Sequence, residues 1–164
     1  MVADMTLRFG AVRVPTTVHW PQVNTVSLAF VLSDELAPTD RRLENSVVVG
    51  LAAGNPAQVE LAALQWVTEH SGELGADCHR ILVAGGARAA RLALAARDNG
   101  WPVLWRQLLV HPTFTTDQPM PTDLAGAPSA IVVCADRHDD GRRYSGRLRA
   151  AGVQVREMSD DGRG

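Results

Sequence analysis

The segment RILVAGGARAARLALAARDNG, residues 80–100, decides the fold. It begins with a strand candidate at 80–84, whose residues 81–84 are all apolar, a pattern typical of a strand covered on both faces. Gly85 and Gly86 follow, and the remainder places alanine and leucine at helical spacing as far as Gly100, a residue type that often ends helices. The segment therefore predicts a strand, a tight turn and a helix over 88–99.

The same alternation of β-rich and alanine-rich runs continues along the chain. Further helices are predicted at 57–70, with Glu60 on the solvated face, and at 140–151. The predicted strands are 11–18, 25–32, 46–51, 80–84, 106–110, 130–135 and 153–157. Because helices and strands alternate, we expect an α/β fold with a mostly parallel, doubly wound sheet of about six to seven strands. Residues 112–128 are rich in proline and predict an irregular connection that replaces a larger segment or lies over a site.

Composition and charge narrow the functional classes. The 164 residues are 46% hydrophobic and 21% charged, which predicts one globular domain over 1–164. The net charge of -2 lacks the basic excess of nucleic-acid-binding proteins, so we expect no nucleic-acid partner. The basic residues are all arginine, which together with abundant alanine is typical of a GC-rich bacterial genome.

Location and cofactor use are predicted from what the sequence lacks. Its apolar runs are too short for a membrane span, and its first ten residues show no secretory signal, so we expect a cytoplasmic protein. Cys78 and Cys134 lie far apart without a CxxC spacing, which favours reduced thiols and predicts no disulfide, metal or cofactor.

Short motifs between Leu64 and Val155 carry a resemblance to a known family. In chain order they are WVTEH (66–70), ELGADCHRI (73–81), VAG (83–85), RQLLVHP (106–112), DLAGAP (123–128), DGRRY (140–144) and LRAAGV (148–153). This series resembles the hormone-sensitive-lipase-like branch of the α/β-hydrolase fold, also called alpha/beta hydrolase fold-3. The resemblance implies a truncated hydrolase core without a full cap, and an esterase or lipase ancestry.

The resemblance also shows where this sequence departs from the family. The family carries its nucleophilic serine in a G-x-S-x-G turn, whereas residues 85–89 read GGARA. Ala87 takes the nucleophile's position and has no lone pair with which to attack a carbonyl. The family's catalytic acid corresponds to a shortened region holding Asp136, His138 and Asp139, and no histidine follows Val155. In place of an HGGG-type oxyanion loop stands SDEL at 33–36, whose acidic side chains would repel an oxyanion.

Three functional hypotheses follow. The first is a catalytically inactive hydrolase-like protein, a pseudoenzyme that acts through ligand binding or protein association. The second is a weak carboxylesterase or lipase-type hydrolase with a non-standard nucleophile, for which Cys134 near His138 is the candidate. The third is a small-anion-binding module, in which backbone N–H groups at Gly86 and the side chains of Arg88 and Arg91 hold the anion.

We also expect a protein partner. The last predicted strand, 153–157, has no covering helix after it and would expose its edge for pairing with another chain. The partner would be a second copy, giving a homodimer, or a hydrolase relative. Tyr144, Leu148 and Val153 are the expected contact residues.

Overall fold

One mostly parallel sheet runs through the computed structural model, which describes residues 1–22, 27–135 and 139–160. The sheet has eight strands in the order β1-β2-β4-β3-β5-β6-β7-β8. Its strands are β1 (Val2–Phe9), β2 (Val12–His19), β3 (Ser27–Leu32), β4 (Ser46–Leu51), β5 (Ile81–Gly85), β6 (Arg106–Val110), β7 (Ala130–Cys134) and β8 (Val155–Ser159). The helices are α1 (Ala57–Glu69), α2 (Ala87–Asn99) and α3 (Asp140–Ala150), with a 3₁₀ turn η1 (Arg41–Leu43).

The strand pairing confirms the predicted α/β fold. Strands β3 to β8 pair in parallel, and the β1–β2 hairpin adds to β4 in antiparallel fashion. Among the strands of the described residues, β1 was not predicted from the sequence. It pairs with β2 along its whole length, and Gly10 between them has a φ of 63°, a conformation that glycine adopts without strain. The start of the predicted strand at 25–26 lies outside the described residues.

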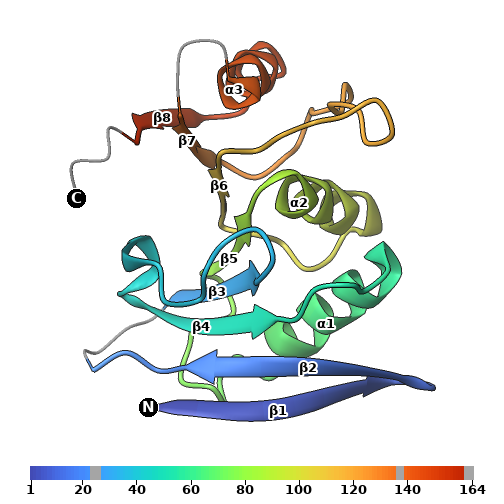
Figure 1. Cartoon of the computed structure of the whole chain (residues 1–164), viewed down its shortest axis with the longest axis vertical. Coiled ribbons are helices and arrows are strands. Elements are labelled where there is room, and N and C mark those ends of the chain that lie inside the picture. The colour runs from blue at the N-terminus through green and yellow to red at the C-terminus, as the bar shows by residue number, and fades with distance from the viewer. Residues whose placement is uncertain (23–26, 136–138, 161–164) are drawn as a thin grey trace.

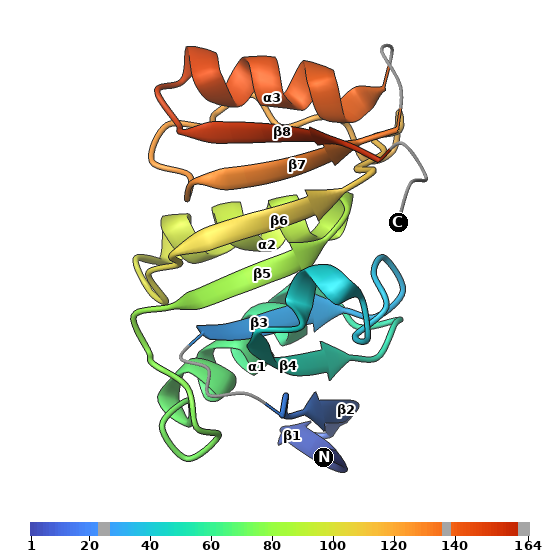
Figure 2. The ribbon, with the colours of Figure 1, turned by 90° about the vertical axis from the view of Figure 1, so that its left-hand side faces the viewer.

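The three helices lie together on one face of the sheet (Figure 1). Their buried side chains join alternate strand residues, such as Phe30, Val83 and Val132, in one large core. On the opposite face, which is turned to the viewer in Figure 2, the described residues hold only the connection through η1. Leu36 and Leu43 of that connection cover the second, smaller core. The layer on this face is therefore much thinner than the helical layer.

The proline-rich connection at 112–128 contains neither helix nor strand, as predicted. It lies along the helical layer between α2 and α3 (Figure 1). Arg91 donates a hydrogen bond to the Pro119 carbonyl at 3.0 Å, and Arg97 donates to the Asp123 and Ala125 carbonyls at 2.7 and 3.0 Å. These contacts attach the connection to the exposed side of α2.

Helix α3 buries the residues that the sequence analysis assigned to a partner contact. Tyr144 and Leu148 are 0% exposed and Val153 is 8% exposed, because all three pack in the core between α3 and the sheet. The Phe114 and Tyr144 rings lie 5.2 Å apart between their centroids. These residues belong to the core of the chain, so a partner would have to use other groups.

Among the helices of the described residues, none has the length and apolar character that a membrane span requires.

Candidate functional site

The turn between β5 and α2 places Ala87 at the carboxyl-terminal edge of the parallel sheet. Strand β5 ends at Gly85, Gly86 precedes the helix, and Ala87 is the first helical residue, with 6% exposure. Gly85 has a φ of 155°, a value that side chains other than glycine rarely adopt. The local sequence thus folds into a strand–turn–helix unit whose first helical side chain is only a methyl group.

The carboxylate of Glu35 fills the space in front of this turn. The backbone N–H of Arg88 donates to Glu35 Oε2 at 3.0 Å, and that of Ala89 donates to Oε1 at 3.1 Å. A Cβ atom added at Gly85 or Gly86 would lie 2.9 Å from a Glu35 oxygen. Both glycines therefore make room for the carboxylate, which satisfies free N–H groups at the start of α2 and lies at the positive end of its dipole.

The side chain of Arg88 connects two further acids. Its Nη1 atom pairs with Asp34 and its Nη2 atom with Glu60, whose side chain is only 6% exposed. The prediction that Glu60 is solvated is therefore wrong. Burial raises the pKa of Glu60, while the hydrogen bond and charge of Arg88 act in the opposite direction. The ion pair keeps an otherwise costly buried carboxylate in place.

The residues of the hypothetical anion site are engaged by the chain itself. The N–H groups that follow Gly86 bind Glu35, the Arg88 guanidinium binds Asp34 and Glu60, and Arg91 binds the Pro119 carbonyl. The anions held at this turn are thus internal carboxylates.

The region expected to hold the catalytic acid caps helix α3. Asp136 and His138 lie outside the described residues. Asp139 is the N-cap residue of α3, where its side chain accepts hydrogen bonds from the N–H groups of Gly141 and Ala135. Asp140 accepts a hydrogen bond from the Phe114 N–H at 2.8 Å, which together with Arg143 lowers the pKa of that carboxyl. Asp139 and Asp140 thus fix the start of the helix.

Cys134, the candidate alternative nucleophile, is 1% exposed at the end of β7. Burial raises the pKa of its thiol, and the charge of Asp139 acts in the same direction. The thiol is therefore protonated at neutral pH, whereas an attacking cysteine needs its thiolate form.

A histidine–aspartate pair that the sequence analysis did not connect lies at the same sheet edge. His111 follows β6, and its Nε2 atom is 3.3 Å from Asp160 Oδ2, just beyond β8. Arg42 of the η1 turn binds the same oxygen at 3.3 Å. Within the described part of the chain, no hydroxyl or thiol is hydrogen-bonded to the His111 ring. Asp160 thus joins the end of β6 and the η1 turn to the end of β8.

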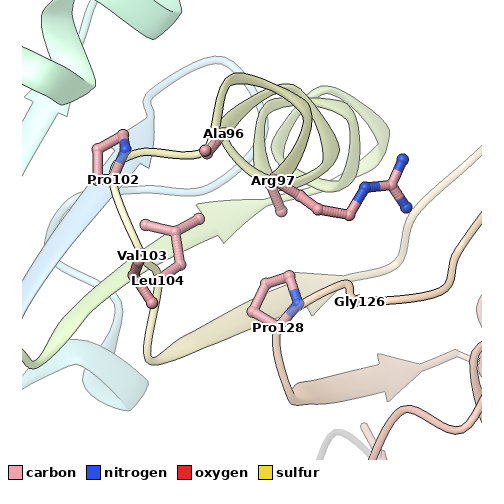
Figure 3. Close-up of a pocket in the computed structure, with 9 residues that line it drawn as sticks. Ala96, Arg97, Pro102, Val103, Leu104, Gly126 and Pro128 are labelled. Atoms are coloured by element: carbon pink, nitrogen blue, oxygen red, sulfur yellow. The ribbon is translucent and has the colours of Figure 1, made fainter.

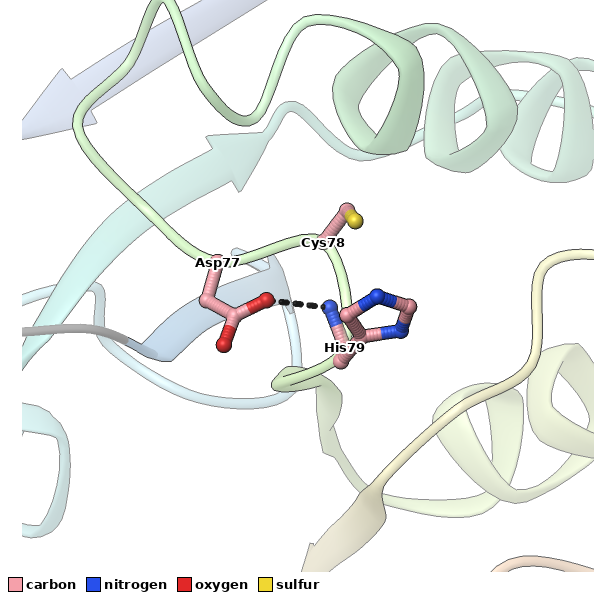
Figure 4. Close-up of side chains that lie close together, drawn as sticks. All are labelled: Asp77, Cys78 and His79. Atoms are coloured by element: carbon pink, nitrogen blue, oxygen red, sulfur yellow. Dashed lines mark hydrogen bonds between the residues drawn. The ribbon is translucent and has the colours of Figure 1, made fainter.

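Two other features lie away from this edge. Asp77, Cys78 and His79 hold potential metal ligand atoms within 4.8 Å of one another (Figure 4). All three are exposed and consecutive in sequence, so they approach an ion from one side, and we assign no metal to them. A hollow between the end of α2 and the 126–128 loop is lined mainly by apolar groups, and the Arg97 guanidinium points away from it (Figure 3).

Comparisons with known proteins agree with this architecture. No protein-family model matches the chain. Carboxylesterase NlhH of Mycobacterium tuberculosis is 29% identical over 224 residues, covering 93% of this chain and 70% of the relative. Esterase LipI of the same organism is 38% identical over 99 residues, covering 57% of this chain and 31% of the relative.

Solved structures show the same fold. A thermostable esterase from Pseudomonas putida ECU1011 superposes with a TM-score of 0.80 at 24% identity, over 97% of this chain and 72% of that one. EstE1, a carboxylesterase cloned from a metagenomic library, gives 0.80 at 21% identity, over 97% of this chain and 78% of that one. The chain has the α/β-hydrolase fold. The NlhH alignment extends over 224 residues whereas this hydrolase-fold chain has 164, so segments of the relative lack a counterpart here.

We expect Glu35→Ala to lower the free energy of unfolding by about 1–2 kcal/mol, because α2 loses the acceptor at its first turn. Urea denaturation measures this loss. Sulfate should raise the melting temperature of Glu35→Ala more than that of the native sequence, because two N–H groups become available to an anion. Glu73→Ala, at an exposed residue, is the control, and equal behaviour of the two variants would contradict the assigned role of Glu35.

We expect Arg88→Gln to destabilise the protein by about 3 kcal/mol at pH 7.5, because Glu60 is left buried without its partner. Loss of Arg88 raises the folded-state pKa of Glu60 further above its unfolded value. In the folded variant Glu60 then keeps a proton at pH values where the unfolded chain has lost it. The stability of the variant therefore falls as pH rises through that folded-state pKa. The loss relative to the native sequence should therefore be smaller at pH 4. Urea denaturation at both pH values tests this.

Arg149→Gln is the matched control for Arg88→Gln. Arg149 pairs with Glu157, whose side chain is 26% exposed and solvated. Its loss should cost about 0.5 kcal/mol, with little change between the two pH values. A penalty for Arg88→Gln that is the same at pH 4 and pH 7.5 would show that Glu60 does not depend on Arg88.

Proposed function

We propose that this chain is a catalytically inactive α/β-hydrolase-like protein that acts through binding or association. The observation that carries the proposal is the position of the Glu35 carboxylate, which accepts the N–H groups of Arg88 and Ala89 directly beside Ala87. In a hydrolase of this fold, the turn supplies a nucleophilic hydroxyl and the N–H group after it stabilises the oxyanion.

Electrostatics make the carboxylate a strong obstacle to ester hydrolysis. A tetrahedral intermediate would need the donors that Glu35 already occupies, and its negative charge would be repelled by that carboxylate. Loss of a triad member typically lowers turnover by roughly 10⁴ to 10⁶, and the activity that remains depends on the oxyanion donors. At this turn the hydroxyl is missing and the donors are occupied.

The alternative is a weak carboxylic ester hydrolase with a different nucleophile. Its support comes from the relatives, since NlhH is named a carboxylesterase and LipI an esterase. His111 paired with Asp160 would be its base, but the Cys134 thiol is buried and its pKa is raised. The geometry therefore favours the inactive protein.

Short-chain p-nitrophenyl ester turnover and fluorophosphonate labelling test the proposal. The native sequence should give neither, and Ala87→Ser should remain inactive because Glu35 still occupies the N–H donors that an oxyanion needs. Turnover that persists through purification and disappears in Cys134→Ala or His111→Ala, but not in the exposed-thiol control Cys78→Ala, would establish the alternative.

The sheet edge at β8 supports the association part of the proposal. Strand β8 pairs only with β7 among the described residues, so its outer edge has backbone groups available for another strand. We propose that this edge pairs with a second copy or with a hydrolase relative. A homodimer formed across it would be symmetric, with β8 facing β8.

Light scattering after size-exclusion chromatography should give twice the 17.6 kDa chain mass at tens of micromolar. The N–H of Asp160 points inward to the Cys134 carbonyl, so that of Ser159 points outward. Ser159→Pro removes this outward donor and should shift the protein toward the monomer. A monomeric mass for the native sequence throughout that range would contradict self-association.

A further inference from the structure

The amino-terminal edge of the sheet has a hollow at the start of β6, β7 and β8, bordered by two arginines. Arg106 begins β6 and Arg156 lies on β8. The other residues that line the hollow are Ser129, Ala130, Ile131, Gln154 and Val155. In the strand register, Arg106 lies opposite Leu82 of β5. Arg156 lies opposite Ile131 of β7, which in turn lies opposite Leu108 of β6. Residues paired in this way project from the same face, so both arginines lie on the apolar side opposite the helices.

We propose that this hollow binds an organic anion, with its carboxylate between Arg106 and Arg156 and its apolar body against the sheet. The first support is charge. Neither arginine has an ion pair with an acid in the described residues, whereas Arg42, Arg88 and Arg149 each have at least one. Two like charges that border one hollow are both stabilised by an anion bound between them.

The second support is the stacking of Arg106 on an aromatic ring. Its Cζ atom lies 4.2 Å from the centroid of the Trp105 ring, and that of Arg80 lies 5.5 Å from the same ring. Stacking restrains a guanidinium while its edge N–H groups remain available for a planar carboxylate. A group held in this way loses less conformational entropy when a ligand binds.

The third support is the apolar surface beside the arginines. The described residues place no helix over β6 to β8 on this face (Figure 2). Ile131 is only partly buried there, and Met158 on β8 is 39% exposed. An apolar chain that extends from the carboxylate would cover this surface. The hollow lies at the amino ends of the strands, opposite the edge that holds Ala87, so its function is independent of the hydrolase turn.

Isothermal titration with octanoate, acetate and octanol tests the proposal on the full chain. Octanoate should bind, acetate should bind more weakly because it lacks the apolar body, and octanol should not bind because it lacks the charge. Arg106→Gln and Arg156→Gln should each weaken octanoate binding roughly tenfold. Arg13→Gln, at an exposed arginine of β2 without an ion pair among the described residues, should leave it unchanged.

Two further variants separate the parts of the site. Trp105→Leu removes the stacking partner of Arg106 and should weaken octanoate binding while both charges remain. Ile131→Ser should weaken octanoate without affecting acetate. Circular dichroism checks that each variant is folded.

The proposal is overturned if octanoate fails to bind, or if it binds Arg13→Gln, Arg106→Gln and Arg156→Gln with equal affinity. Acetate and octanoate binding equally well would overturn the assignment of an apolar body. None of these measurements involves ester hydrolysis. Their failure would therefore leave the inactive-hydrolase proposal unaffected, and esterase activity would leave the anion site unaffected.

Discussion

The arrangement at the carboxyl ends of the parallel strands depends on one contact, the hydrogen bonds from the N–H groups of Arg88 and Ala89 to Glu35. They join the segment after β3 to the start of α2, and they restrict positions 85 and 86 to glycine because a Cβ would meet the carboxylate. Arg88 extends the contact to Glu60 on α1. In hydrolases of this fold the turn serves catalysis, whereas in this chain it holds three elements together. The same N–H donors cannot bind both Glu35 and an oxyanion.

The unequal covering of the two sheet faces is the second feature that shapes the molecule. Helices α1, α2 and α3 cover one face, and Leu36 and Leu43 cover part of the other. A parallel sheet normally has helices on both faces, because its strands are apolar on both sides. The strands here retain that apolar character across β6 and β7. The short connection through η1 thus leaves part of this face without a helical cover.

Much of the fold was predictable because it follows from local patterns. The strands at 46–51 and 106–110 have the predicted limits, and α2 begins one residue earlier than expected. Strand β1 was predictable too, since Met5, Leu7 and Phe9 alternate with polar residues before Gly10. Glu60 was misassigned because helical periodicity places it on the polar side of α1, and periodicity cannot show that Arg88 of another helix covers it.

The sequence by itself determined the alternation of strands and helices and the absence of a hydroxyl at Ala87, because both are properties of neighbouring residues. Only the tertiary structure decided where Glu35 lies, which acids Arg88 binds and that His111 meets Asp160. These residues lie on separate strands and connections. Whether their side chains come into contact depends on the path that each connection takes at the edge of the sheet. Local propensity does not encode that path; it is set by the packing of the whole chain.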